Sequence, residues 1–298
     1  MFDLTPQLDC AGRLVKLDRP RVMGIVNVTP DSFSDGGRHG TVEAAVAHGL
    51  KLAAEGADLL DVGGESTRPG ADPVSLEDEL ARVVPVIERL ARETSLPISV
   101  DTSKPEVMRA AVAAGAGMIN DVYALRREGA LDAAASLGVP VVLMHMLGEP
   151  QGMQDAPHYG DVVGDVHRFL AERLFACEMA GIAKKNLVVD PGFGFGKTLE
   201  HNLRLLRQLA RLADLGVPVL AGLSRKRSLG EITGRAVDDR VHASVAAAVL
   251  AAEYGARLVR VHDVAATVDA MKVWAAVAAL PAPKAVAAKP SIRWPDDE

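Results

Sequence analysis

The sequence predicts a closed (β/α)8 barrel, an eight-stranded parallel sheet surrounded by helices. Short apolar segments alternate along the chain with longer segments of helical periodicity, which is the pattern of repeated βαβ units. A glycine suited to end a helix precedes several of these apolar segments, as at Gly56, Gly115 and Gly255. The chain has 298 residues, which is enough for a barrel of about 250 residues.

Each predicted strand is too short and too apolar to lie at the surface, so each should be buried on both faces. The eight strands are residues 22–28, 59–62, 98–101, 118–122, 139–144, 187–190, 217–221 and 258–261. The helices expected around them are residues 42–55, 76–92, 105–114, 131–136, 161–180, 199–213, 240–254 and 265–279. Ser75 and Pro105 mark the starts of two of these helices, because both residue types are common there.

These elements form one predicted domain over residues 1–280, and the Ala- and Pro-rich segment 281–298 is expected to be a flexible tail. An open doubly wound sheet is the alternative, but it usually carries a Gly-rich phosphate turn after its first strand. No such turn follows residues 22–28. The segment 191–198 ends like a P-loop, yet it has a proline at the position of that motif's first glycine.

Composition excludes several classes of function. The 33 Lys and Arg residues against 39 Asp and Glu give a net charge of −6, which argues against nucleic acid or an anionic membrane as the partner. Cys10 and Cys177 form neither a disulfide framework nor a zinc motif, and they fit a reducing cytoplasm. The sequence lacks an apolar run of about 18 residues and an export signal at its start.

Polar side chains gather where the predicted strands end, which is the end of a barrel that carries active sites. Helix capping would explain some of them, especially Ser103, Asp121 and Asp263. It does not explain the cations there, because positive charge is favourable at the other end of a helix. These cations are Lys226, Arg260 and His262.

The polar groups predict two kinds of binding zone. Asp101, Asn120 and Asp190 offer acceptors for a flat, nitrogen-rich ring, and Lys226 offers a donor for a ring carbonyl. A cationic zone suits a phosphate or a diphosphate. Its members are Arg68, Arg260 and His262. The amide oxygen of Asn27 suits Mg²⁺ that is held mainly by water and substrate phosphates.

Six segments in order resemble signature motifs of the dihydropteroate synthase family. They are GIVNVTPDSFSDGG (24–37), DVGGESTRPG (61–70), VDTSKP (100–105), IND (119–121), DPGFGFGK (190–197) and GLSRK (222–226). The resemblance covers about residues 21–280 and implies a TIM-barrel transferase of folate synthesis. Such an enzyme joins 4-aminobenzoate to 6-hydroxymethyl-7,8-dihydropterin diphosphate and releases pyrophosphate.

The resemblance also implies a role for each matching residue. The pterin contacts would be Asp101, Asn120, Asp190 and Lys226, with Met144 and Phe195 lining the pocket and Arg260 covering a ring face. The diphosphate would be bound by Thr67, Arg68, Arg260 and His262, with Asn27 on Mg²⁺. The aminobenzoate would lie near Phe33, Thr67, Pro69, Ser224 and Lys226.

The implied chemistry needs no nucleophilic side chain. The breaking C–O bond lies beside the conjugated pterin imine, so diphosphate can leave ahead of amine attack. A carboxylate such as Asp35 could stabilise the resulting cation, while Mg²⁺ and the cationic residues, Arg260 among them, neutralise the leaving group. Sulfonamides that carry an aniline should compete with 4-aminobenzoate.

Other interpretations of the sequence remain open. A methyltetrahydrofolate-dependent methyltransferase would share the acidic pterin contacts but has no use for the cationic zone, and a non-catalytic paralogue would have eroded loops. His145 fits either a catalytic or a buried structural histidine. The Ala-rich stripe 245–252 suggests helix packing or a subunit contact, and we expect a homodimer.

Overall fold

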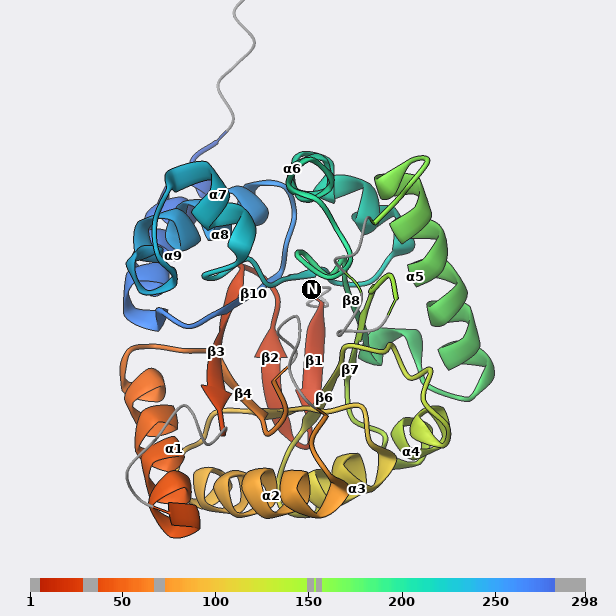
Figure 1. Ribbon diagram of the computed structural model, residues 1–298, viewed down its shortest axis with the longest axis vertical. Helices are drawn as coiled ribbons and strands as arrows, with labels where there is room; N and C mark the ends of the chain where they lie inside the picture. The colour runs from red at the N-terminus through yellow and green to blue at the C-terminus, as the bar shows by residue number, and fades with distance from the viewer. Residues whose placement is uncertain (1–5, 29–36, 67–72, 149–152, 154–156, 282–298) are drawn as a thin grey trace, which may run out of the picture.

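A computed structural model of the chain describes residues 6–28, 37–66, 73–148, 153 and 157–281. Its main sheet has eight parallel strands enclosed by a ring of helices (Figure 1). In chain order these strands are β3 (Arg21–Asn27), β4 (Leu59–Gly63), β5 (Ile98–Asp101), β6 (Met118–Asp121), β7 (Val141–Met144), β8 (Leu187–Asp190), β9 (Leu220–Ala221) and β10 (Leu258–Val261). All eight predicted strands are confirmed, three of them with the expected bounds.

The strand order closes the sheet into the predicted barrel. The strands are arranged as β8-β7-β6-β5-β4-β3-β10-β9, and a parallel bridge between Val189 and Val219 joins the two ends. The Val189 N–H donates to the Pro218 carbonyl at 3.0 Å. The open doubly wound alternative is therefore wrong.

Helices follow the strands at the predicted places. They are α1 (Gly37–Ala54), α2 (Leu76–Glu93), α3 (Pro105–Ala113), α4 (Ala130–Leu137), α5 (Val162–Met179), α6 (Leu199–Arg207), α7 (Arg227–Thr233), α8 (Val241–Glu253) and α9 (Val264–Ala278). Ser75 caps α2 by accepting the Asp78 N–H at 3.1 Å. The predicted helix-ending glycines adopt positive φ, 96° at Gly56 and 114° at Gly115, a conformation that costs glycine least.

Two helical segments differ from the prediction. The helix expected over residues 199–213 ends as an α-helix at Arg207 and continues as a 3-10 helix over Leu209–Leu215. Helix α7 was not predicted because its sequence is polar and contains Gly230. A Cβ at Gly230 would lie 2.3 Å from the Arg240 guanidinium, so the neighbouring side chain needs a glycine there.

An N-terminal hairpin was also missed. Strands β1 (Gln7–Cys10) and β2 (Arg13–Lys16) pair in antiparallel fashion and lie across the middle of the ring in Figure 1. Three of their apolar side chains, together with the Leu17 side chain that follows β2, join one cluster with the inward-facing residues at the start of the barrel strands. The hairpin members of that cluster are Leu8, Cys10, Val15 and Leu17. The hairpin therefore closes the amino-terminal end of the barrel.

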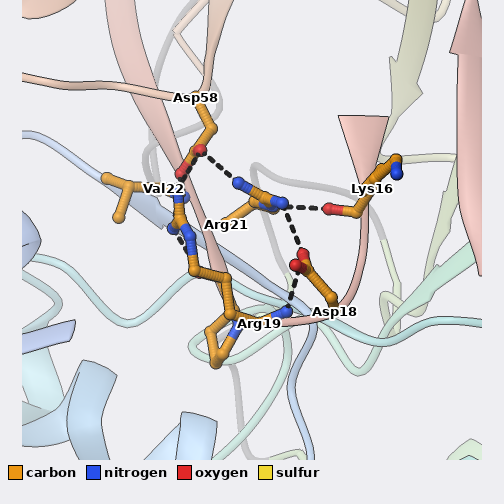
Figure 2. Close-up of polar contacts among 7 residues, drawn as sticks. Lys16, Asp18, Arg19, Arg21, Val22 and Asp58 are labelled. Atoms are coloured by element: carbon orange, nitrogen blue, oxygen red, sulfur yellow. Dashed lines mark hydrogen bonds and ion pairs between the residues drawn. The ribbon is translucent and has the colours of Figure 1, made fainter. Parts of the chain in front are cut away.

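Charged side chains fix the hairpin to the barrel (Figure 2). The Asp58 carboxylate accepts from Arg19 at 2.6 Å and from Arg21 at 2.9 Å, and it also accepts the Val22 N–H at 2.9 Å. Arg21 in turn donates to Asp18 at 2.5 Å. One carboxylate before β4 thus holds both the chain after the hairpin and the start of β3.

The interior of the barrel changes from apolar to polar along the strands. Residues i and i+2 of a strand point to the same side, and the inward apolar layer includes Leu59, Met118 and Val188. Two residues further on, the same three strands carry Asp61, Asn120 and Asp190. In β10 the step is from Leu258 to Arg260. The polar layer therefore lies at the carboxyl ends of the strands, as predicted.

No helix among the described residues is both long and apolar enough to cross a membrane. Cys10 and Cys177 are buried free thiols, in agreement with the expected lack of a disulfide. The predicted tail lies outside the described residues apart from Pro281.

Candidate active site

The strand register places the predicted ring contacts beside one another. Asp101 of β5 is the direct neighbour of Asn120 in β6, and Met144 of β7 is the direct neighbour of Asp190 in β8. Asn27 and Gly63 continue the same row on the other side of Asp101. The row brings residues that are distant in the sequence to one end of the barrel.

Asp61 and Arg260 organise the middle of this row. The Arg260 guanidinium donates from Nε to Asp61 Oδ2 at 2.5 Å and from Nη2 to Asp101 Oδ2 at 2.8 Å. The same Asp61 oxygen accepts the Asn120 amide N–H at 3.0 Å. Because Nδ2 of Asn120 donates to Asp61, its amide oxygen remains the group that can accept from a ligand.

Burial makes these carboxyls easier to protonate than carboxyls in water. Desolvation raises the pKa of Asp101 to about 7, although Arg260 opposes the shift. Desolvation also raises the pKa of Asp190, whose Oδ1 accepts the Gly192 N–H at 2.7 Å. Further hydrogen-bond donors would stabilise the ionised form of both groups, and a ring with several N–H groups would supply them.

Lys226 is the ammonium of the site. Its Nζ donates to the Phe193 carbonyl and lies 4.1 Å from the centre of the Phe195 ring. Burial lowers the pKa of Lys226 to about 8, while the nearby Asp190 carboxylate opposes the shift. Lys226 can therefore donate to a ring carbonyl beside the acceptors of the row.

Ser224 and His262 are paired with each other. The Ser224 hydroxyl accepts a hydrogen bond from the backbone N–H of His262 at 3.2 Å. The same hydroxyl lies 3.0 Å from the ring nitrogen Nδ1 of His262. The next residue, Arg225, has φ 57° and makes a two-pronged ion pair with Asp263 at 2.6 and 3.1 Å. The left-handed conformation of Arg225 is strained for a residue with a side chain. It fixes the relative orientation of the neighbouring Ser224 and Lys226 side chains.

An apolar wall borders the polar row. Met144 and Phe195, the predicted lining residues, belong to one buried cluster. Its other members are Val122, Tyr123, Met146 and Met153. A flat ring between this wall and the carboxylates would have one apolar flank and a hydrogen-bonding edge.

The predicted metal contact, Asn27, ends β3 in the same row. Among the described residues, no three His, Cys, Asp or Glu side chains form a group that could hold a metal ion. A single hard oxygen fits Mg²⁺, which keeps most of its water and binds substrate phosphates. The residues present are therefore compatible with a magnesium ion that arrives with a diphosphate.

Capping does not account for the three residues for which it was proposed. Asp121 accepts the Tyr123 and Leu125 N–H groups at 2.8 and 2.7 Å, which fixes a loop nine residues before α4 begins. Ser103 donates to Asp121 at 2.5 Å, and Asp263 pairs with Arg225 instead of capping α9. These interactions with side chains and loops were not visible in the local sequence.

Several predicted site residues lie outside the described part of the chain. They are Phe33, Asp35, Thr67, Arg68 and Pro69.

Two site residues were missed by the sequence prediction. The 61–70 motif indicates no separate role for Asp61, although a carboxylate inside an apolar strand is the available signal. Lys197 belongs to the segment that resembles a P-loop, but its ammonium binds protein carbonyls at Gly192 and Phe195. The P-loop interpretation is therefore rejected.

Comparison with known proteins gives a consistent result. The family model described as pterin binding enzyme matches residues 23–262. The dihydropteroate synthase of Escherichia coli strain K12 is 52% identical over 267 residues, which cover 90% of this chain and 95% of the relative. Two structures of the Xanthomonas albilineans dihydropteroate synthase, with 4-aminobenzoic acid and with 7,8-dihydropteroate, are 72% and 68% identical to this chain. Their TM-scores are 0.89 and 0.85, and each comparison covers 93% of this chain and 100% of the solved chain.

Proposed function

The chain belongs to the family of pterin-binding enzymes and, within it, to the dihydropteroate synthases, and we propose that its barrel mouth condenses two substrates. The substrates are 4-aminobenzoate and 6-hydroxymethyl-7,8-dihydropterin diphosphate, and the products are 7,8-dihydropteroate and pyrophosphate. The enzyme is a transferase, because a pterin-methyl group passes from diphosphate oxygen to the arylamine nitrogen.

One observation carries this proposal: acceptors, a donor and an apolar wall surround the same end of the barrel. Asp101 and Asn120 are adjacent in register, as are Met144 and Asp190. Lys226 stands beside Phe195. This set complements a pterin, which is flat, has N–H donors and a carbonyl on its edge, and presents an apolar face.

The side chains support a reaction in which leaving-group departure precedes attack. The C–O bond breaks, the pyrophosphate leaves with its electron pair, and the amine forms the C–N bond and then gives up a proton. Arg260 and His262 are cationic or hydrogen-bonding groups at the end of β10 that suit the departing phosphates. Asp35 is proposed to stabilise the pterin cation, and Thr67 and Arg68 to join the diphosphate site.

Mg²⁺ is the proposed metal, and Asn27 would hold it. When bound, the metal neutralises charge on the diphosphate. The chain's own contribution is to bind the ring at the carboxylate row, which consists of Asp101, Asn120 and Asp190. It also presents cationic side chains toward the diphosphate.

The second substrate is proposed to lie near Ser224 and Lys226, against a wall supplied by Phe33 and Pro69. A sulfonamide with an aniline group should compete for that place. The hydrogen-bonded contact between Ser224 and His262 supports a subsite whose outer edge lies beside the proposed diphosphate zone. A homodimer and a cytoplasmic location are further proposals, the latter supported by the two unpaired thiols.

The test is product formation from pterin diphosphate and 4-aminobenzoate with Mg²⁺, followed by separation of 7,8-dihydropteroate. We expect product only when both substrates are present. Turnover of methyltetrahydrofolate in its place would favour the methyltransferase alternative, and pterin binding without either reaction would favour a non-catalytic paralogue.

A further inference from the structure

Lys197 is a buried lysine that the proposed chemistry does not use. The residue is only 3% exposed, and its side-chain nitrogen lies among four acceptors. It donates to the Gly192 and Phe195 carbonyls at 2.9 Å each, and it lies 2.9 Å from His145 Nδ1 and 3.4 Å from the His145 carbonyl. Burial lowers the pKa of Lys197 well below its ordinary value, although the Asp190 carboxylate opposes the shift. Burying a lysine is costly unless its donors are satisfied, so these four acceptors offset part of that cost.

His145 acts as a neutral acceptor for Lys197. Burial lowers the pKa of His145 to about 2, and the Lys197 charge adds to the shift. The ring packs edge-on against Phe169, with 4.9 Å between ring centres. A neutral, fixed imidazole that accepts at Nδ1 carries its proton at Nε2.

The segment that Lys197 holds is residues 191–197, here named the Lys197 loop. It lies in direct backbone contact with the chain after β7. A Cβ at Gly192 would lie 1.9 Å from the His145 carbonyl oxygen, and one at Gly196 would lie 2.5 Å from the Leu147 carbonyl oxygen. Only glycine allows this approach, so the loop has one close-packed position against β7.

Pterin-binding side chains rest on the same loop. Lys226 donates to the Phe193 carbonyl and lies over the Phe195 ring. Asp190 directly precedes the loop and accepts the Gly192 N–H at 2.7 Å. The two carbonyls bound by Lys197 therefore belong to residues that contact the site, since Gly192 donates to Asp190 and the Phe195 ring contacts Lys226.

We infer that Lys197 is a positioning residue, which holds the Lys197 loop against the end of β7 and thereby places the pterin-binding side chains. This inference rests on the proposed function, because it assigns the loop to the pterin half of the site. Lys197 itself is enclosed by protein acceptors, so its effect on the ring passes through Phe195, Lys226 and Asp190.

The experiment uses Lys197→Met, which keeps an unbranched side chain but removes the ammonium. Pterin diphosphate affinity is measured by calorimetry, and KM and kcat are measured for both substrates. We expect at least about a tenfold rise in Kd and KM for the pterin substrate, as for a lost charge-assisted hydrogen bond. The KM for 4-aminobenzoate at saturating pterin diphosphate should stay within about twofold. A merely structural role would instead reduce the active fraction, lowering kcat and leaving both KM values unchanged.

Tyr159→Phe is the matched control. Tyr159 donates to the Gly196 carbonyl at 2.8 Å, so the variant removes a hydrogen bond from the same loop without touching the acceptors of Lys197. We expect its pterin Kd to remain within about twofold of the wild-type value.

A second pair of variants keeps the inference testable if Lys197→Met does not fold. His145→Asn retains an acceptor near the position of Nδ1, whereas His145→Leu removes it, so pterin affinity should fall more in His145→Leu. An unchanged pterin Kd in folded Lys197→Met, or equal affinities in the two His145 variants, would overturn the inference alone. Wild-type protein that does not bind pterin diphosphate would overturn the proposed function as well.

Discussion

Asp101 should make pterin binding dependent on pH in the neutral range. Burial raises its pKa to about 7, against the ordinary value of 3.8. Arg260 already occupies Asp101 Oδ2, so the other oxygen is the one that can accept from the ring. Protonation of Asp101 would reduce that acceptor capacity, and affinity should therefore fall as pH drops through about 7.

The size of this effect follows from the fraction of ionised Asp101. If the ionised form binds, the apparent Kd rises by the factor 1 + 10 to the power (pKa − pH), which gives about 30-fold at pH 5.5 relative to pH 8. This corresponds to about 2 kcal/mol. The assay is calorimetric titration of wild-type enzyme with the pterin substrate from pH 5.5 to 8.

Asp101→Asn is the control, because it cannot ionise and any titration of the ligand remains in the measurement. We expect weaker binding, by about 1–3 kcal/mol at pH 8, and little of the wild-type pH dependence. Equal wild-type affinity at pH 5.5 and pH 8, or the same pH profile in the variant, would refute the reasoning.

The raised pKa of Asp101 affects folding stability in the opposite direction: low pH weakens pterin binding but strengthens the contribution of this group to the folded state. The pKa of Asp101 is higher in the folded chain than its ordinary value, so the folded state holds the proton more tightly between about pH 4 and pH 7. This stabilisation is fully present below pH 3.8 and is lost as pH rises through about 7. Its size over the whole range is about 4 kcal/mol, of which roughly 2–3 kcal/mol falls between pH 5 and pH 8. The change in the wild-type minus Asp101→Asn difference in urea unfolding between these two pH values measures that part.

Three further predictions concern single side chains. Asp190→Asn should weaken pterin binding by about 1–3 kcal/mol in calorimetry, because a charge-assisted acceptor is lost; unaltered affinity would place the ring elsewhere. Lys104→Met should destabilise the fold by about 3–5 kcal/mol in denaturant unfolding, because Lys104 pairs at 2.5 Å with Glu79, whose side chain is 0% exposed, and a buried carboxylate would lose its partner; a loss below about 1 kcal/mol would contradict a structural role for this ion pair. Asn27→Ala should raise the Mg²⁺ concentration needed for half-maximal turnover, and unchanged magnesium dependence would contradict the proposed metal contact.

The sequence predicted the barrel because its strands are buried on both faces and are therefore short apolar runs. The polar residues that interrupt these runs are mainly those of the candidate site. Asp101, Asn120 and Asp190 could be placed at one end because parallel strands share a direction. The hairpin of β1 and β2 could not be predicted, because half of its residues are polar, unlike those of the apolar barrel strands. Its partner cluster is also assembled from distant residues such as Met118 and Val188.

Pairing within the site was likewise hidden. Arg260 was expected to meet a ligand, and in the structure it pairs with Asp61 and Asp101, which lie 199 and 159 residues away. The sequence argued against a P-loop at Lys197 but indicated no other role for it, because the carbonyls that surround it become acceptors only after the glycines of the loop fold against the chain that follows β7. Such contacts depend on closure of the barrel.

The central claim is that the carboxylate row at the barrel mouth binds the pterin ring. A crystal structure of the enzyme with 6-hydroxymethyl-7,8-dihydropterin diphosphate tests it most directly. The expected result is ring nitrogens within about 3.2 Å of Asp190 and of the Asn120 amide oxygen, with the ring beside Met144. A pterin bound away from the strand ends would contradict the claim. In that case the polar side chains of the row would still be hydrogen-bonded only to one another.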